Sequence, residues 1–422
     1  MFGLRCGFIS SFLFVLFSVG LHVVQPHYAW SASKTGSGDI VLGMSAPFSG
    51  PSRGLGIELY RGARAYFDHV NAEGGVEGRK IRILALDDGY DPGPALQNTI
   101  RFLNDKSVLC LFGYVGTPTV TRVLPVLKAS SQNAKLLFFP FTGAQPQREE
   151  PYARFVFNLR ASYRQELAAL VNRFSLAGLK RVAIFYQNDA YGRSGWNSLR
   201  QALSMHRLDI VAEATYRRGA TYSDSMAGQV RILMEGKPDA IVLVASYSAG
   251  ASFIRDARLM GLTVPIANIS FAGSENLLRR LKRLGREVDR DLTVNLINTQ
   301  VVPSYRDEHL DAVRLYRRLL AGKIPVPPGA ETGYVSPGLS DVGFEGFLDA
   351  VIMTQVLKRF VTVPHCSLEA AAEGLQDVDA GIDAAVSFGK ERHQGLSRVY
   401  FTTVRDGCFV SLPDEGWQQW QK

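Results

Sequence analysis

Several residue patterns that mark enzymes are missing from this chain of 422 residues. There is no Gly-x-Ser-x-Gly elbow between a predicted strand and a predicted helix, and no Gly-x-x-x-x-Gly-Lys-Ser/Thr phosphate loop. The turn after the first predicted strand, FSGPSRGLG, lacks the Gly-x-Gly-x-x-Gly pattern of dinucleotide-binding turns. These absences argue against a serine hydrolase, a nucleotide hydrolase and a nicotinamide-dependent enzyme. We therefore expect no catalytic residues and no cofactor.

Cysteine is scarce. The chain has 4 cysteines and no Cys-x-x-Cys pair, which argues against a metal site. Cys6 lies near the N-terminus, and Cys110 lies in the apolar run SVLCLFGY, where we expect a buried thiol. Cys366 and Cys408 remain, and an oxidising compartment would permit a disulfide between them. The sequence does not supply their separation in space, so a disulfide and two free thiols both stay open.

Long apolar runs are also absent, except for one from Phe8 to Val24. This run follows Arg5 and precedes small residues that include Ser31 and Ser33. The layout predicts a secretory signal peptide over residues 1–33 and hence a protein exported to the periplasm. An uncleaved membrane anchor is the alternative, because the run approaches the length that spans a bilayer.

Charge is moderate in amount and basic in sign, with a formal net charge of +8 and an isoelectric point near 9.3. One basic cluster stands out, RRLKRLGR over residues 279–286. We interpret it as a solvated helix face, with a polyanion site as the alternative. No basic and aromatic residues are interleaved as in single-strand-binding proteins, so we expect no nucleic-acid partner.

What the chain has in abundance is an alternation of apolar strands with amphipathic helices, which begins at residue 39 and starts again after residue 157. This alternation predicts βαβ units, and therefore an α/β fold of two doubly wound parallel-sheet lobes. The predicted lobe 1 comprises residues 38–157 plus 300–385, and the predicted lobe 2 comprises residues 160–295 plus 395–415. The extended segment 292–303 is predicted to cross between the lobes. Residues 397–412 are predicted to form a hairpin around an Arg-Asp-Gly turn.

The turns after the predicted strands carry most of the hydroxyl and aromatic residues that could hold a small molecule. In FGYVGTPTVTRVLPVL, residues 112–127, Thr117 is the expected N-cap and Pro118 the first helical residue. The free N–H groups of such a helix start can bind a ligand, although capping alone is the alternative. Asp87 and Asp88 are interpreted as turn and capping residues rather than as an acid–base pair.

An ordered set of motifs resembles a known family. The runs VLGMSAPFSGP, VNAEGGVEGRKI, LALDDGYDP and FGYVGTPT, followed by KRVAIFYQNDAYGRSG and NISFAGSENLL, resemble type I periplasmic solute-binding proteins of ABC transporters, in the branch of the leucine/isoleucine/valine-binding proteins. The resemblance implies two lobes joined by three crossovers, near residues 156–162, 293–303 and 385–395, with a ligand cleft between them. It also implies a monomer that captures a small solute, such as an amino acid or an amide, and delivers it to a membrane permease. A ligand sensor of the same fold that signals to a regulator is the alternative.

The family's contact positions can be transferred to this sequence one by one. They are Leu55, Thr117, Thr119, Phe141, Thr142 and Gly143 in lobe 1, and Tyr191, Tyr247 and Ser270 in lobe 2. Two departures matter: Leu55 stands where amino-acid binders have an aromatic residue, and Ser270 stands where they have the acid that binds the ammonium. Glu275 is interpreted as a first-turn residue of the next helix. An apolar or aromatic carboxylate, an amide or another neutral solute is therefore as well supported as an amino acid.

Overall fold

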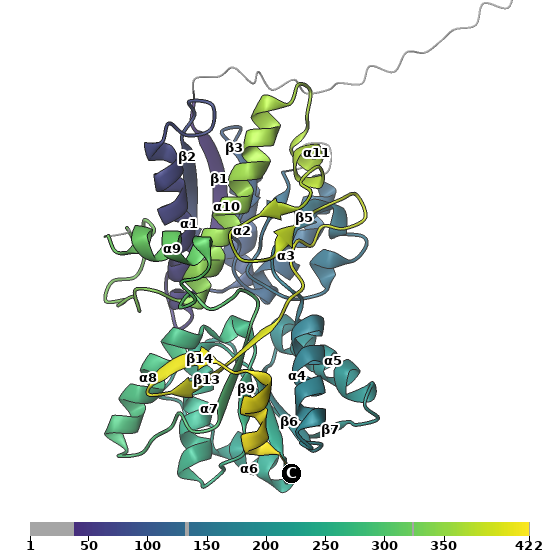
Figure 1. Cartoon of the computed structure of the whole chain (residues 1–422), viewed down its shortest axis with the longest axis vertical. Coiled ribbons are helices and arrows are strands. Elements are labelled where there is room, and N and C mark those ends of the chain that lie inside the picture. The colour runs from purple at the N-terminus through teal and green to yellow at the C-terminus, as the bar shows by residue number, and fades with distance from the viewer. Residues whose placement is uncertain (1–37, 131–134, 323–324, 422) are drawn as a thin grey trace, which may run out of the picture. The chain divides into compact units, whose positions relative to one another are not determined.

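The computed structural model describes residues 38–130, 135–322 and 325–421, so the predicted signal peptide lies outside the described residues. In these ranges the chain forms two α/β lobes, each built on its own sheet (Figure 1). The predicted fold class is thus confirmed. Of the helices in these ranges, none has the combined length and apolar character of a membrane span.

Lobe 1 is built on a sheet of five parallel strands in the order β2-β1-β3-β4-β5. Its strands are β1 (Ile40–Ala46), β2 (Ile81–Asp87), β3 (Val108–Phe112), β4 (Leu137–Phe138) and β5 (Val156–Phe157). Its helices are α1 (Arg53–Ala72), α2 (Pro92–Asn104), α3 (Thr117–Ala129), α9 (Asp311–Leu320), α10 (Asp341–Thr362) and α11 (Leu368–Glu373), with the short 3-10 turns η2 (Pro146–Arg148) and η3 (Ala153–Phe155) and a small hairpin of β11 (Val378–Asp379) and β12 (Ala385–Val386).

Both faces of the lobe 1 sheet are covered, because successive side chains of a strand point to opposite faces. Phe112 and Phe138 pack in the core beneath α1, α9 and α10, whereas their neighbours Leu111 and Leu137 pack in the core beneath α2 and α3. This arrangement explains why the strands are apolar almost throughout.

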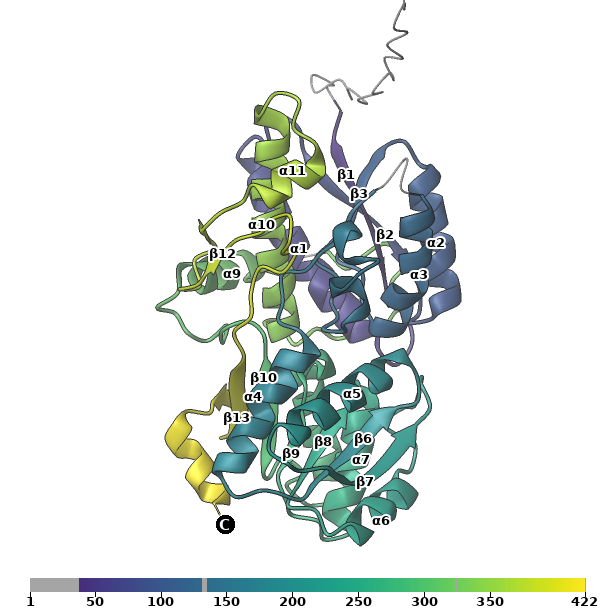
Figure 2. The same ribbon diagram turned by 90° about the vertical axis from the view of Figure 1, so that its right-hand side faces the viewer.

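Lobe 2 is built on a sheet of seven strands in the order β14-β13-β10-β9-β8-β6-β7. The parallel strands are β6 (Val182–Gln187), β7 (Ile210–Tyr216), β8 (Ala240–Val244), β9 (Ile266–Asn268) and β10 (Leu296–Gln300), and the antiparallel ones are β13 (Tyr400–Arg405) and β14 (Cys408–Ser411). The helices are α4 (Tyr163–Leu176), α5 (Ala190–Ser204), α6 (Ala227–Glu235), α7 (Tyr247–Leu259) and α8 (Ser274–Glu287), with the 3-10 turns η4 (Ser270–Ala272) and η5 (Asp414–Trp420). α4 packs beside α5 (Figure 2). α7 packs beside α8.

The chain passes between the lobes three times: from β5 to α4, from β10 to α9 and from β12 to β13. The prediction that residues 292–303 form a crossing was wrong in one respect. Residues 296–300 form β10, which is buried along its length between β9 and β13, and the crossing follows this strand. The predicted C-terminal hairpin is confirmed as β13 and β14.

Candidate ligand-binding site

The lobe 1 half of the candidate site is formed by the turns that follow β3 and β4. Val115 and Phe141 form a bridge, which brings the two turns side by side. Next to this bridge the hydroxyls of Thr117 and Thr142 lie 2.7 Å apart. The hydroxyl of Tyr163, the first residue of α4 in lobe 2, lies 3.5 Å from Thr117 Oγ1. All three side chains are buried, so the hydroxyls form a shielded polar group at the start of α3.

The start of α3 differs from the prediction by one residue. Gly116, with φ of 111°, is the N-cap, and Thr117 is the first helical residue. A Cβ on Gly116 would lie 2.4 Å from the Tyr90 ring, so both the backbone conformation and the close contact require glycine here. Because Gly116 caps the helix, the Thr117 hydroxyl makes no capping hydrogen bond and contacts Thr142 instead.

Two further predicted contact residues, Thr119 and Gly143, lie at these turns but offer no free polar side-chain group to a ligand. Thr119 Oγ1 donates to the Val115 carbonyl at 2.7 Å, back into its own turn. Gly143 lies against Tyr163: its carbonyl accepts the Tyr163 N–H at 2.7 Å, and a Cβ on it would lie 2.5 Å from the Tyr163 ring.

The lobe 2 half is dominated by Tyr191, which follows the α5 N-cap Asp189. Its ring centroid lies 5.7 Å from that of Tyr163 and 4.6 Å from that of Phe271. Its buried hydroxyl has no hydrogen-bond partner among the described residues. Burial raises the pKa of Tyr191 well above its usual value, so the hydroxyl is a neutral donor. An unpartnered buried hydroxyl costs about 1–3 kcal/mol, which a ligand could recover.

Phe271 joins the two halves, and the sequence interpretation missed it. Its ring centroid lies 5.3 Å from Phe141 and 5.9 Å from Tyr90, both in lobe 1, as well as near Tyr191. One continuous core cluster therefore runs from lobe 2 into lobe 1 through this ring. The only sequence signal was its place directly after Ser270.

Ser270 belongs to a buried ionic network rather than to an open wall. Its N–H and its hydroxyl both donate to Glu166 at 2.9 Å, and Arg160 donates to its hydroxyl. The Arg160 guanidinium lies 3.4 Å from Glu345 and 4.7 Å above the centre of the Phe141 ring. Burial alone would lower the pKa of Arg160, but Glu345 and Glu166 hold it above its usual value. Arg160 is thus a permanent buried cation beside the aromatic cluster, and neither it nor Glu166 was predicted.

Tyr247 and Leu55 lie where the two lobes meet. The Tyr247 hydroxyl accepts the Gly54 N–H at 3.1 Å, which links α7 to α1. Leu55 is fully buried, and a Cβ on Gly273 of lobe 2 would lie 2.8 Å from its Cδ2 atom. These two predicted contact residues therefore close the seam between the lobes.

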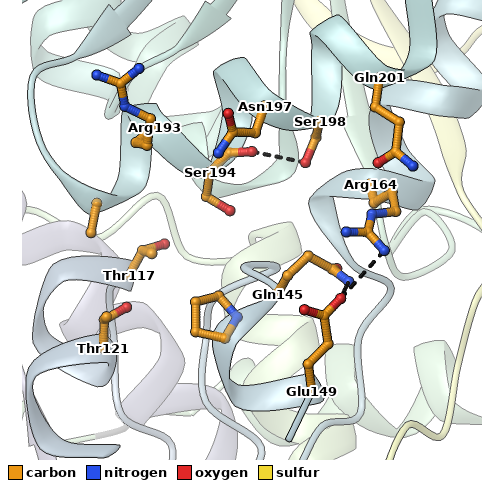
Figure 3. Close-up of a pocket in the computed structure, with 12 residues that line it drawn as sticks. Thr117, Thr121, Gln145, Glu149, Arg164, Arg193, Ser194, Asn197, Ser198 and Gln201 are labelled. Atoms are coloured by element: carbon orange, nitrogen blue, oxygen red, sulfur yellow. Dashed lines mark hydrogen bonds and ion pairs between the residues drawn. The ribbon is translucent and has the colours of Figure 1, made fainter.

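A cavity of ≈ 370 Å³ opens beside this cluster, between α3 and η2 of lobe 1 and α5 of lobe 2 (Figure 3). Its volume lies within the usual range of small-molecule sites. It is lined by Thr117, Thr121, Gln145, Pro146, Glu149, Arg164, Ala190, Arg193, Ser194, Asn197, Ser198 and Gln201. Thr117 is the one predicted contact residue among them, so it connects the cavity to the buried hydroxyls.

The sequence profile of the periplasmic binding protein family matches residues 39–408. The chain belongs to this family. Among curated relatives, this periplasmic binding protein is similar to the Leu/Ile/Val-binding protein homolog 7 of Brucella melitensis biotype 1, with 26% identity over 71% of this chain and 75% of the relative. The predicted membership of the Leu/Ile/Val-binding-like branch is thereby confirmed.

Solved structures agree with this assignment. A "possible leucine/isoleucine/valine-binding protein" from Rhodopirellula baltica has a TM-score of 0.76 and 29% identity, over 90% of this chain and 97% of that one. A fatty acid ABC transporter substrate-binding protein from Thermomonospora curvata has a TM-score of 0.74 and 20% identity, over 92% and 96% of the two chains. The family is one of solute-binding proteins, and its name gives the periplasm as its location.

In this periplasmic binding protein three carboxylates near the cleft accept hydrogen bonds from the protein itself. Glu166 accepts from Ser270 and Thr299. Glu275 lies in the first turn of α8, as predicted; its Oε2 accepts the Asp341 N–H at 3.3 Å, whereas its Oε1 has no hydrogen-bond partner among the described residues. Asp88 accepts from Ser45 at 2.8 Å and from the Tyr90 N–H at 2.9 Å, which confirms its predicted role in a turn.

Cys366 and Cys408, the two cysteines for which a disulfide stayed open, are both free thiols in this structure. Cys366 follows α10 and packs against the lobe 1 core, whereas Cys408 begins β14 of the lobe 2 sheet. The two cysteines are close to the C-terminus in sequence but belong to different lobes. Within the described residues, no group of three or more His, Cys, Asp and Glu side chains could hold a metal ion.

Proposed function

We propose that this periplasmic binding protein captures a small organic solute between its lobes and delivers it to the permease of an ABC importer, by binding and without catalysis. The observation that carries the proposal is the unpartnered Tyr191 hydroxyl of lobe 2, buried beside Phe271, whose ring also contacts Tyr90 and Phe141 of lobe 1. A solute that touches both lobes favours the closed arrangement, and a permease can recognise that arrangement.

The proposed solute has an apolar or flat body and lacks a free ammonium group. An ammonium buried in the cleft would need a carboxylate partner. Both oxygens of Glu166 already accept hydrogen bonds, Glu275 lies outside the cavity lining, and Glu149 of that lining lies 3.4 Å from Arg164. A carboxylate end would instead meet the Thr117 and Thr142 hydroxyls and the free N–H groups in the first turn of α3. The names of the relatives, which specify leucine, isoleucine and valine or a fatty acid, agree with an apolar body.

A thermal-shift screen of the mature protein tests this proposal. The panel contains branched-chain amino acids, the matching carboxylates without the amino group, amides, aromatic carboxylates and fatty acids. Binding to the native state stabilises it by about 2.7 kcal/mol at a hundredfold excess over Kd, which raises Tm measurably. We expect the largest rise with a carboxylate or neutral solute. If α-amino acids gave the largest rise, the proposed solute class would be wrong.

Two substitutions then locate the site by calorimetry with the best solute. Tyr191→Phe removes the unpartnered hydroxyl, and Thr117→Val removes one member of the hydroxyl pair. Each should weaken binding by about tenfold, the usual loss for one hydrogen bond to a charged or well-placed group. The matched controls are Tyr316→Phe and Thr354→Val, whose hydroxyls bond within lobe 1 to Ser340 and Ala350. Equal losses in all four variants would contradict the site.

A further inference from the structure

A second concave surface lies at the seam between the lobes, apart from the cavity beside α5. It is a groove of ≈ 330 Å³ whose lining residues include five arginines and no acidic side chain. The lining consists of Arg53, Gly333, Tyr334 and Val335 from lobe 1 and Tyr247, Asn276, Arg279, Arg280, Arg283 and Arg286 from lobe 2. We call it the arginine groove. It contains the four arginines of the basic cluster of residues 279–286, which the proposed function does not use.

The positive charge of the arginine groove is only partly compensated. Arg53 lies 3.4 Å from Glu331, and Arg283 lies 3.2 Å from Glu287. Arg280 lies over the Tyr222 ring at 4.2 Å. Neither Arg280 nor Arg286 has a carboxylate ion-pair partner among the described residues. Like charges held together on one wall repel one another, and a multivalent anion would relieve that repulsion.

The walls of the groove are held in place by polar contacts, which distinguishes it from a solvated helix face. The Tyr334 hydroxyl donates to Glu58 Oε1 at 3.0 Å and lies 3.3 Å from Asn276. Arg279 donates to the Val335 carbonyl and to Asn276 Oδ1. The 333–335 turn of lobe 1 is thus attached to α8 of lobe 2, and both sides of the groove are formed before any ligand arrives.

We propose that the arginine groove binds a small multivalent anion with carboxylate or phosphate groups. Guanidinium groups bind both kinds of oxygen through paired hydrogen bonds, and the volume suits a small molecule rather than a macromolecule. Because Arg53 belongs to lobe 1 and α8 to lobe 2, the anion contacts both lobes. It therefore favours the arrangement in which they meet, and by linkage it raises the affinity of the cleft for its solute.

Isothermal titration with citrate and with pyrophosphate, at constant ionic strength, tests the groove and separates the two chemistries. The test variant is Arg280→Gln/Arg286→Gln. The control is Arg314→Gln/Arg318→Gln, which removes two charges from α9, outside the groove. We expect saturable binding of at least one anion to the wild type, a loss of at least about tenfold in the test variant, and no more than about twofold in the control. Circular dichroism of both variants establishes that they are folded.

Two results would overturn the proposal: no saturable binding of either anion, or equal losses in the two double variants. Failure of the groove would not affect the proposed function, because Tyr191 lies outside the groove lining. Tyr191→Phe should weaken solute binding and leave anion binding unchanged. The single variant Arg286→Gln, at an exposed position, repeats the test with less risk to folding.

Discussion

At the scale of single residues, Arg160 is a buried cation whose stability depends on carboxylate partners. It is fully buried, and its guanidinium faces Glu166 at 3.5 Å and Glu345 at 3.4 Å. Burial raises the pKa of Glu345 to about 7, and Arg160 opposes that rise. The ion pairs join the first crossover to α4 and α10, so this residue holds together elements that are far apart in sequence.

Replacing Arg160 by methionine should lower the free energy of unfolding by about 3–5 kcal/mol, because Glu166 and Glu345 would remain buried without their cation. Urea denaturation measures the change. The control is Arg82→Ala, whose ion pair with Asp39 is exposed and should contribute less than about 1 kcal/mol. A loss below about 1 kcal/mol in Arg160→Met would show that Arg160 does not stabilise these carboxylates.

At the scale of elements, α1 and α10 of lobe 1 pack with their backbones in close contact. A Cβ on Gly62 would lie 1.7 Å from the Gly343 carbonyl oxygen, and one on Gly346 would lie 2.2 Å from the Leu59 carbonyl oxygen. The two backbones therefore touch at these glycines. This contact fixes α1, which follows the turn after β1 at the seam.

Gly62→Ala should destabilise the protein by about 3 kcal/mol or more, since backbone atoms cannot move aside as a side chain can. Gly228→Ala in α6 is the matched control, because nothing lies within 4 Å of its added Cβ. There the helix propensity of alanine should leave stability unchanged or raise it by up to about 1 kcal/mol. Thermal and urea denaturation give the free energy of unfolding of both variants. Similar values for the two variants would contradict the close contact between α1 and α10.

At the scale of the whole described molecule, a pair of carboxyl groups lies across the seam. Glu275 of α8 accepts the backbone N–H of Asp341 of α10, beside Tyr305 and Arg306. Burial raises the pKa of Glu275 to about 7. Burial, and then the Glu275 charge, raise the pKa of Asp341 well above its usual value. Near neutral pH the pair therefore retains a proton, which the unfolded chain would have lost.

Stability should consequently fall as the pH rises through about 7, because a raised folded-state pKa stabilises the fold only while the group is protonated. Glu275→Gln should remove on the order of 1 kcal/mol of this pH dependence between pH 5.5 and pH 8. Urea denaturation across this range, with Glu287→Gln of the exposed α8 face as control, measures the difference. Identical pH profiles for the wild type and Glu275→Gln would contradict the shared proton.

The sequence by itself determined the local features of this protein. The alternation of apolar strands and amphipathic helices depends on neighbouring residues, so the parallel strands of both sheets were predictable. The resemblance to the family placed Thr117 and Thr142 in one site, and their hydroxyls do lie together. The predicted start of α3 was wrong by one residue, because Gly116 rather than Thr117 is the N-cap.

Only the tertiary structure decided which distant residues meet. Phe271 reaches lobe 1, Arg160 contacts Ser270 from 110 positions away, and Cys366 and Cys408 belong to different lobes. It also decided that the basic cluster of α8 faces Arg53 across a groove. Such contacts arise when the chain passes between the lobes and α8 docks beside the 333–335 turn. No local periodicity records them, because they depend on the packing of elements and not on the spacing of residues.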